Sequence, residues 1–223
     1  MQPDKLCELS VATFDKLAER YTEKYFSLDV YDDYLKRFCG HLDKPGMQVL
    51  DIACGPGNVS AFLLRERPDL HITGVDLAPG MIKQARQKVP QAQSQVQSQI
   101  QFIVEDCRHL ERLGKTFDAA TYAFGLSYLT DSDADQFFAS LGAVLRPSAP
   151  FYLSTMTGPR SLSGLDTSSS GDQIYIEYRP WQDVVAMVED AGFGVVFHEL
   201  VASPANASKQ TQDLVLIAKG KAA

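Results

Sequence analysis

The chain has 223 residues, of which 45% are hydrophobic and 22% charged, a composition typical of a globular protein with one α/β domain. A formal net charge of −7 argues against a general nucleic-acid or anionic-membrane surface. The sequence shows no signal-peptide pattern and no apolar run of about 18 residues, so we expect a cytoplasmic protein without a membrane span. Its four cysteines lack CxxC spacing and do not cluster with its histidines, so we expect reduced thiols and no metal site.

Two amphipathic helices are predicted ahead of any strand. Apolar and aromatic residues recur at helical offsets over 11–25, and a second helical pattern covers 31–42. Such aromatic faces either pack on the core or cap a ligand site. Periodicity alone slightly favours packing.

Apolar runs then alternate with helical patterns. Strands are expected at 48–51, 71–77, 102–106, 116–124 and 150–155, with helices between most of them. Strands that alternate with helices predict a doubly wound α/β sheet.

Local signals predict several boundaries. Segment 91–101 has glutamine at every odd position and is interpreted as a linker rather than an edge strand. Asp131 is expected to cap the helix that follows it, and Pro180 to be the first residue of the last helix. Segment 158–172 is rich in serine and glycine and is interpreted as a lid or a disordered loop, with a short strand at 174–178.

Two last strands, at 195–197 and 214–218, have no helix between them and predict an antiparallel hairpin at one sheet edge. The predicted fold is therefore α/β, a doubly wound, seven-stranded, mainly parallel sheet with an antiparallel C-terminal hairpin and an N-terminal helical cap. We expect a single domain. Its parts are a cap or lid (1–44), a ligand-binding core (45–157), a loop excursion near substrate (158–180) and a C-terminal helix with strands (181–223).

Carboxylates follow three successive predicted strands, as Asp51, Asp76 and Asp106. Ligands of such sheets lie across the C-terminal ends of the strands, so three carboxylates there predict a shared site. Asp51 precedes a glycine turn, where it would repel a diphosphate, and Ser60 replaces the third glycine of GxGxxG. A ligand with ammonium and sulfonium groups would tolerate Asp51, and Asp76 suits a ribose diol.

Together these residues resemble the motifs of the class I S-adenosylmethionine-dependent methyltransferases. Val49-Leu50-Asp51-Ile52-Ala53-Cys54-Gly55-Pro56-Gly57 is similar to the first motif of that family. Gly74-Val75-Asp76-Leu77-Ala78-Pro79-Gly80-Met81 is similar to the second, and Glu105-Asp106-Cys107 to the third. Phe117-Asp118, Leu145-Arg146-Pro147 and Gly192-Phe193 match later ones.

The resemblance implies S-adenosylmethionine as cofactor and a role for each matching residue. The Ala53–Gly57 turn would approach the methionine part, with Asp51 orienting it directly or through water. Asp76 would bind the ribose hydroxyls, and the adenine would meet Leu77, Met81, Asp106 and the Cys107 backbone. Residues 14–21 resemble the segment that small-molecule members fold over the cofactor, which makes Tyr21 a contact and favours the lid interpretation. The implied cofactor set is Tyr21, Asp51, Ala53, Cys54, Gly55, Gly57, Asp76, Leu77, Met81, Asp106 and Cys107.

The function implied is methyl transfer to O, N or C of a small-molecule acceptor by a monomer or homodimer. Methyltransferases that act on the amino groups of nucleic-acid bases or of glutamine side chains carry an Asn-Pro-Pro-Tyr-like element after the fourth strand. This sequence lacks that element, which favours a small-molecule acceptor over nucleic acid. No catalytic base stands out, and the aromatic residues Tyr25, Tyr122, Tyr128 and Tyr178 are candidate substrate contacts. Two alternatives remain: a non-catalytic protein that binds S-adenosylmethionine or S-adenosylhomocysteine, and a Rossmann-type nucleotide-dependent enzyme.

Overall fold

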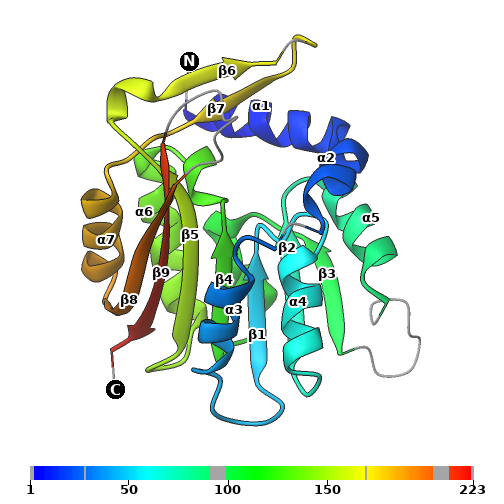
Figure 1. Ribbon diagram of the computed structural model, residues 1–223, viewed down its shortest axis with the longest axis vertical. Coiled ribbons are helices and arrows are strands. Elements are labelled where there is room, and N and C mark those ends of the chain that lie inside the picture. The colour runs from blue at the N-terminus through cyan, green and yellow to red at the C-terminus, as the bar shows by residue number, and fades with distance from the viewer. Residues whose placement is uncertain (1–2, 28, 91–98, 169, 203–210, 222–223) are drawn as a thin grey trace.

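A seven-stranded sheet, in the order β3-β2-β1-β4-β5-β9-β8, organises the molecule in a computed structural model (Figure 1). The structure describes residues 3–27, 29–90, 99–168, 170–202 and 211–221. Strands from β3 to β5 are parallel, and β9 is antiparallel to both β5 and β8. The predicted fold class and its antiparallel C-terminal hairpin are confirmed.

The sheet strands are β1 (Gln48–Ile52), β2 (His71–Asp76), β3 (Ile100–Val104), β4 (Ala119–Ala123), β5 (Pro150–Thr157), β8 (Phe193–Ala202) and β9 (Gln212–Gly220). The α-helices are α1 (Pro3–Lys16), α2 (Ala18–Tyr25), α3 (Asp32–Cys39), α4 (Asn58–Glu66), α5 (Pro79–Lys88), α6 (Asp131–Val144) and α7 (Trp181–Asp190). Short 3-10 helices are η2 (Cys107–Leu113), η3 (Leu126–Tyr128) and η4 (Arg160–Leu162). A separate hairpin joins β6 (Gly164–Thr167) and β7 (Gln173–Ile176).

Both faces of the sheet are buried, as expected for parallel strands connected by helices. On one face, Phe137 of α6 and Val184 of α7 belong to one apolar cluster. On the other face, Phe38 of α3, Leu63 of α4 and Ile82 of α5 belong to a second. The two layers leave the C-terminal edge of the parallel strands as the place where a ligand can meet backbone and side chains.

Three helix predictions need correction. The helix predicted over 11–25 starts earlier and breaks at Leu17 (φ −100°, ψ 11°), so that α1 and α2 are separate. The cap of α6 is not Asp131 but Thr130. The Thr130 hydroxyl accepts from the Asp133 backbone N–H, and the Asp133 carboxylate accepts from the Thr130 backbone N–H. Pro180 precedes α7 rather than starting it, because its ψ of 141° is extended.

The segment 158–172, predicted as a lid or a disordered loop, has regular structure among its described residues. It contains η4 and β6, and β6 pairs antiparallel with β7 from Gly164↔Ile176 to Thr167↔Gln173. The predicted short strand at 174–178 corresponds to β7. Most of the glutamine-rich segment lies outside the described residues, but Gln101 is part of β3.

Helix α1 lies across the C-terminal edge of the sheet and is anchored on both sides (Figure 1). Ser10 Oγ accepts from the Tyr175 backbone N–H (2.9 Å), and Thr13 Oγ1 donates to the Gln173 carbonyl (2.6 Å), which attaches α1 to β7. Asp15 accepts from the Gly80 N–H at the start of α5. The helix therefore covers the edge of the sheet where the ligand was expected.

None of the helices in the described ranges is both long and apolar enough to span a lipid bilayer. Within those ranges, no three histidine, cysteine or carboxylate side chains come together as ligands for a metal ion.

Candidate functional site

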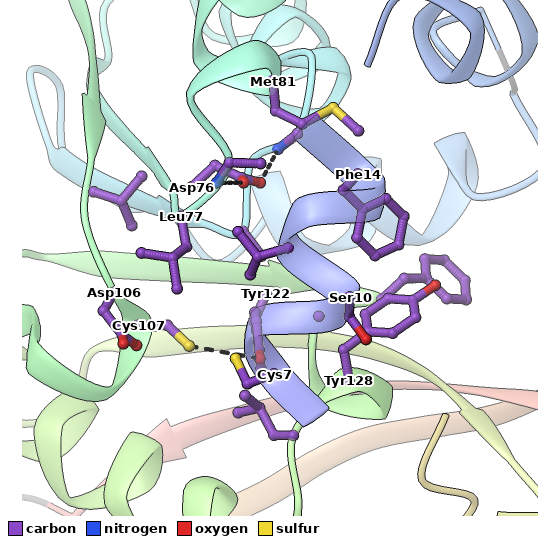
Figure 2. Close-up of a pocket in the computed structure, with 18 of the residues that line it drawn as sticks. Cys7, Ser10, Phe14, Asp76, Leu77, Met81, Asp106, Cys107, Tyr122 and Tyr128 are labelled. Atoms are coloured by element: carbon purple, nitrogen blue, oxygen red, sulfur yellow. Dashed lines mark hydrogen bonds between the residues drawn. The ribbon is translucent and has the colours of Figure 1, made fainter. Parts of the chain in front are cut away.

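A cavity partly open to solvent lies between α1 and the C-terminal edge of the sheet. Asp76 and Asp106 lie on one side of it, and the rings of Phe14 and Tyr128 on the other (Figure 2). Predicted site residues that line it are Tyr21, Ala53, Gly55, Asp76, Leu77, Met81, Asp106, Cys107, Tyr122 and Tyr128.

The glycine turn after β1 forms one wall of the cavity. Ala53, Gly55 and Gly57 all have positive φ, at 48°, 52° and 85°. A non-glycine residue such as Ala53 adopts this conformation only when its surroundings hold it there, which occurs often at ligand sites. Gly57 does not line the cavity; a Cβ there would lie 2.8 Å from Val89 Cγ2 and 3.0 Å from Phe102 Cζ, so glycine permits the turn to pack against these side chains.

Asp76, the last residue of β2, is fixed by two backbone donors. The Gly55 N–H donates to its Oδ2 (2.9 Å) and the Ala78 N–H to its Oδ1 (2.8 Å). Burial raises the pKa of Asp76 to about 6, although these two hydrogen bonds act in the opposite direction. The result is an oriented carboxylate, linked to the glycine turn, with further lone pairs that can accept from a diol.

Asp106 caps η2 beside the cavity and is paired with Arg108. Its carboxylate accepts from the Arg108 backbone N–H and lies 2.7 Å from Arg108 Nη2. Burial acts to raise the pKa of Asp106, but the hydrogen bonds from Arg108 outweigh it and lower that pKa. Arg108 also pairs with Asp133 of α6 at 2.6 Å. Asp106 is therefore an ionised acceptor whose position is held from α6.

Cys107 and Tyr122 form a neutral polar pair on the cavity wall. The Cys107 Sγ lies 3.9 Å from the Tyr122 hydroxyl oxygen (Figure 2). Burial raises the pKa of both groups well above their ordinary values, so neither ionises near neutral pH. The pair can donate hydrogen bonds to a ligand but cannot act as a base.

Asp51 lies beneath the glycine turn, 1% exposed, rather than on the cavity wall. Ser60 Oγ (2.6 Å) and Thr121 Oγ1 (2.9 Å) donate to its two oxygens, which joins β1 to α4 and β4. Burial raises the pKa of Asp51 to about 6, with these hydrogen bonds opposing the shift. Cys54 is also buried, 4% exposed, beside Gly74.

Because the pKa of Asp51 is higher in the folded than in the unfolded chain, it should make stability depend on pH. Between about pH 4 and pH 6 the folded chain keeps a proton that the unfolded chain releases, so the free energy of unfolding falls as pH rises through this window. We expect this contribution to be about 2–3 kcal/mol. In Asp51→Asn, the amide can accept from Ser60 and donate to Thr121, and this contribution should disappear.

Urea unfolding of wild type and Asp51→Asn at pH 4, 5, 6 and 7 measures the effect. The free energy of unfolding of the wild type minus that of Asp51→Asn should fall from pH 4 to pH 6 and stay constant above pH 6. A difference that stays constant or grows with pH would contradict the assignment.

Aromatic side chains close the cavity under α1. The Phe14 ring meets the Tyr128 ring (4.8 Å between centroids) and the Tyr21 ring (5.8 Å) edge to face. Tyr21 in turn packs on Tyr25 at 4.6 Å. Burial raises the pKa of Tyr21 to about 12, so its hydroxyl stays protonated.

A second cleft lies between the α1–α2 pair and the β6–β7 hairpin. It shares Phe14 and Tyr21 with the cavity, and Tyr25, Arg20 and Lys24 also line it. Tyr25 therefore lies on this cleft, whereas Tyr178 is buried, 4% exposed.

Several cavity residues were not among those predicted from sequence. Cys7 and Ser10 of α1 were missed because the predicted helix started after them, and Val11 and Phe14 lay within that helix but were not assigned to the site. Glu105 belongs to the third motif and Phe124 ends a predicted strand, so position along the chain could have included both.

Known proteins share this arrangement in part of the chain. Residues 49–148, which include the glycine turn, Asp76 and Asp106, match the model of a methyltransferase domain. The ubiquinone/menaquinone biosynthesis C-methyltransferase UbiE of Shewanella halifaxensis is 26% identical, with 99% of this chain and 93% of that protein covered. The chain is thus similar to methyltransferases over its glycine turn and strand-end carboxylates and, at lower identity, over nearly its whole length.

Other similarities are more limited. A demethylmenaquinone methyltransferase of Thermotoga maritima is 32% identical over 121 residues, but the match spans only 49% of that protein and 53% of this chain. The fold is shared with the 1,6-didemethyltoxoflavin-N1-methyltransferase of Burkholderia thailandensis, at a TM-score of 0.73 and 19% identity, with 99% and 91% of the two chains covered. The family model does not extend to α1, α2 or the hairpin.

Proposed function

We propose that this chain transfers the methyl group of S-adenosylmethionine to a small-molecule acceptor. The observation that carries the proposal is the Asp76 carboxylate, fixed by the glycine turn and facing the cavity, with Asp106 beside it after the next strand. The residues present fit the cofactor: Asp76 for the ribose diol, Asp106 for the adenine amino group, and Leu77 with Met81 for the ring. The cofactor would supply a methyl group already activated by its sulfonium.

The protein's part in this reaction is to position the two molecules and exclude water. Helix α1 covers the cavity, and its attachments to β7 and α5 hold it there. Alignment of nucleophile, methyl carbon and sulfur can contribute a large part of the rate, since effective molarities of about 10⁵ M or more are known for well-oriented groups.

A dinucleotide fits the site less well. The third glycine of a dinucleotide turn is replaced by Ser60, whose hydroxyl is engaged by Asp51 directly under the turn. A diphosphate there would lie near two carboxylates, Asp51 and Asp76, and would be repelled.

For the acceptor, we propose a flat aromatic ring, such as a quinol, methylated on carbon, nitrogen or oxygen. The rings of Phe14, Tyr21 and Tyr128 in the cavity and of Tyr25 in the adjoining cleft offer apolar faces for such a molecule. Two relatives are named for methylation in menaquinone or ubiquinone biosynthesis, and a third protein of the same fold for methylation of 1,6-didemethyltoxoflavin.

Methyl transfer to a defined panel tests the proposal. Full-length protein would be incubated with S-adenosylmethionine and 1,4-dihydroxynaphthalene, catechol or benzimidazole, which offer ring carbon, oxygen and nitrogen. We expect acceptor-dependent release of S-adenosylhomocysteine and a product heavier by one methylene unit with at least one of them, the quinol first. Binding of S-adenosylhomocysteine without turnover of any acceptor would instead favour the non-catalytic alternative.

A further inference from the structure

The cleft between the α1–α2 pair and the β6–β7 hairpin contains charged residues that have no role in the site described so far. The hairpin runs alongside α1, and the cleft opens between it and the two helices (Figure 1). Phe14 and Tyr21 line both this cleft and the cofactor cavity, so the two spaces meet at these rings. A molecule bound in the cleft would therefore have one end beside the cofactor.

The walls of this cleft are joined by direct contacts between α1 and the hairpin. Thr13, which lines the cleft, donates from its hydroxyl to the Gln173 carbonyl at 2.6 Å. Lys16 Nζ, at the end of α1, lies 2.6 Å from an oxygen of Asp172, which also lines the cleft. The cleft is therefore built from elements that are anchored to one another.

A row of aromatic rings leads from the cavity into the cleft. The Tyr128 ring, in the cavity, meets the Phe14 ring at 4.8 Å between centroids. The Phe14 ring meets the Tyr21 ring at 5.8 Å, and Tyr21 meets the Tyr25 ring of the cleft at 4.6 Å. Lys24 Nζ lies 4.8 Å from the centroid of the Tyr25 ring, at the end of the row. A flat molecule that packs along this row would have one end at the cavity and the other near a cation.

Two cationic side chains line the α2 wall of the cleft. Arg20 and Lys24 are four residues apart, so they lie on the same face of α2. Among the residues that the structure describes, neither forms an ion pair or donates a hydrogen bond. In a chain with a formal net charge of −7, most of the surface repels small anions, so a cation pair without carboxylate partners marks a place where one can bind.

The hairpin wall carries two carboxylates, and in the described ranges neither is paired with Arg20 or Lys24. Asp172 is engaged by Lys16, whose hydrogen bond is the largest cause of its lowered pKa, while the charge of Arg20 contributes less. Asp166, on β6, acts on the buried Tyr178. The cleft therefore has a cationic wall on α2 that faces aromatic surface and still lacks a counter-ion.

We propose that this cleft is the acceptor site and that the acceptor is an aromatic carboxylate, an inference that rests on the proposed methyl transfer. Arg20 binds the carboxylate, since a guanidinium can donate two parallel hydrogen bonds to its oxygens, and Lys24 adds a second positive charge. The ring of the acceptor lies against Tyr21 and Tyr25, and the atom to be methylated is at the Phe14 end, beside the cavity. Because Arg20, Lys24 and Tyr21 belong to α2, one helix contacts both the acceptor and the cofactor cavity.

Acceptors that differ only in charge test this anionic subsite. Full-length protein would be incubated with S-adenosylmethionine and either 3,4-dihydroxybenzoate or 3,4-dihydroxybenzamide, and likewise with benzimidazole-5-carboxylate or its carboxamide. We expect kcat/KM to be about 10-fold higher for the carboxylate of a methylated pair, the size of effect that one hydrogen bond between charged groups can give. The preference should decrease as salt is added, because ions screen the attraction to Arg20 and Lys24.

The double variant Arg20→Gln/Lys24→Gln assigns the preference to these two residues. It should raise KM for the carboxylate about 10-fold and leave kcat, the carboxamide and the affinity for S-adenosylhomocysteine unchanged. The matched control is Lys36→Gln/Lys44→Gln, which removes the same charge from two exposed positions that do not line the cleft. It should keep the preference for the carboxylate.

A binding measurement tests the subsite without turnover. Protein saturated with S-adenosylhomocysteine would be titrated with naphthalene-2-carboxylate and with naphthalene-2-carboxamide in a calorimeter. We expect the carboxylate to bind about 10-fold more tightly than the carboxamide, and this difference to disappear in Arg20→Gln/Lys24→Gln.

The outcomes separate the subsite from the proposed function. Equal kcat/KM and equal affinity for carboxylate and carboxamide would overturn the subsite and leave methyl transfer standing. A preference for the carboxylate that survives in Arg20→Gln/Lys24→Gln would overturn the assignment to these residues. Binding of the naphthalene carboxylate that depends on Arg20 and Lys24, without methylation of any acceptor, would support the subsite while the proposed function fails. Neither binding nor methylation would overturn both.

Discussion

Asp76→Ala is expected to weaken S-adenosylhomocysteine binding by at least about 100-fold. The carboxylate would accept both ribose hydroxyls, and hydrogen bonds to a charged group contribute about 1.5–3 kcal/mol each, so loss of two exceeds the 2.7 kcal/mol of a 100-fold change, as an order-of-magnitude estimate. The substitution also removes the acceptor of the Gly55 and Ala78 N–H groups, which loosens the glycine turn. Titration calorimetry of both proteins measures the loss.

The matched control is Asp135→Ala, which removes the same charge from an exposed position of α6. It should bind S-adenosylhomocysteine as the wild type does. Circular dichroism would confirm that both variants are folded. Affinity of Asp76→Ala within threefold of the wild type would show that Asp76 does not bind the ribose.

The second large effect is on stability, through Arg179. This arginine is 2% exposed and donates from Nη1 to the Leu126 carbonyl (3.3 Å), from Nη2 to the Leu129 carbonyl (2.8 Å) and from Nε to Asp131 (2.9 Å). The two carbonyls bracket η3, which carries Tyr128 into the cavity. Arg179→Met keeps an unbranched apolar chain but leaves the Leu129 carbonyl without its donor, whereas the Leu126 carbonyl keeps the Leu129 N–H.

We expect Arg179→Met to lower the free energy of unfolding by about 3 kcal/mol, because an unsatisfied buried polar group costs about 1–3 kcal/mol. For a chain of this length, that corresponds to a decrease in Tm of roughly 6–12 °C. Asp131→Asn is the control: Asp131 has a side chain 57% exposed, so its loss should cost less than about 1 kcal/mol. If urea unfolding shows equal losses of unfolding free energy in the two variants, the stabilisation comes from the ion pair between Arg179 and Asp131 and not from the hydrogen bonds to the carbonyls.

The alternation of strands and helices, and the carboxylates at strand ends, were readable from the sequence because they depend on local pattern. Asp76 is an example: a β-type run, an acidic residue and a helix with an early proline identify the strand end without tertiary information. The break at Leu17 was not readable, since both sides of it continue one apolar periodicity and only docking on β7 and α5 separates α1 from α2.

Residues whose role depends on distant partners were missed. Nothing local indicates that Arg179 is buried, because its acceptors come from η3 and Asp131, some 50 positions earlier in the chain. Asp213, whose carboxylate accepts from the Tyr31 hydroxyl, likewise stands near the start of a strand, and only the antiparallel pairing of β9 with β5 brings it to Tyr31. Thr130 is a more local case: it was adjacent to the predicted cap, and the Thr-x-x-Asp pattern marks it.

The central claim is that the cavity under α1 binds the adenosyl cofactor of a methyltransferase. Calorimetric titration of the full chain with S-adenosylhomocysteine and, separately, with NAD tests it most directly. We expect one saturable site for S-adenosylhomocysteine and no measurable heat of binding for NAD. Saturable binding of NAD with none of S-adenosylhomocysteine would contradict the claim.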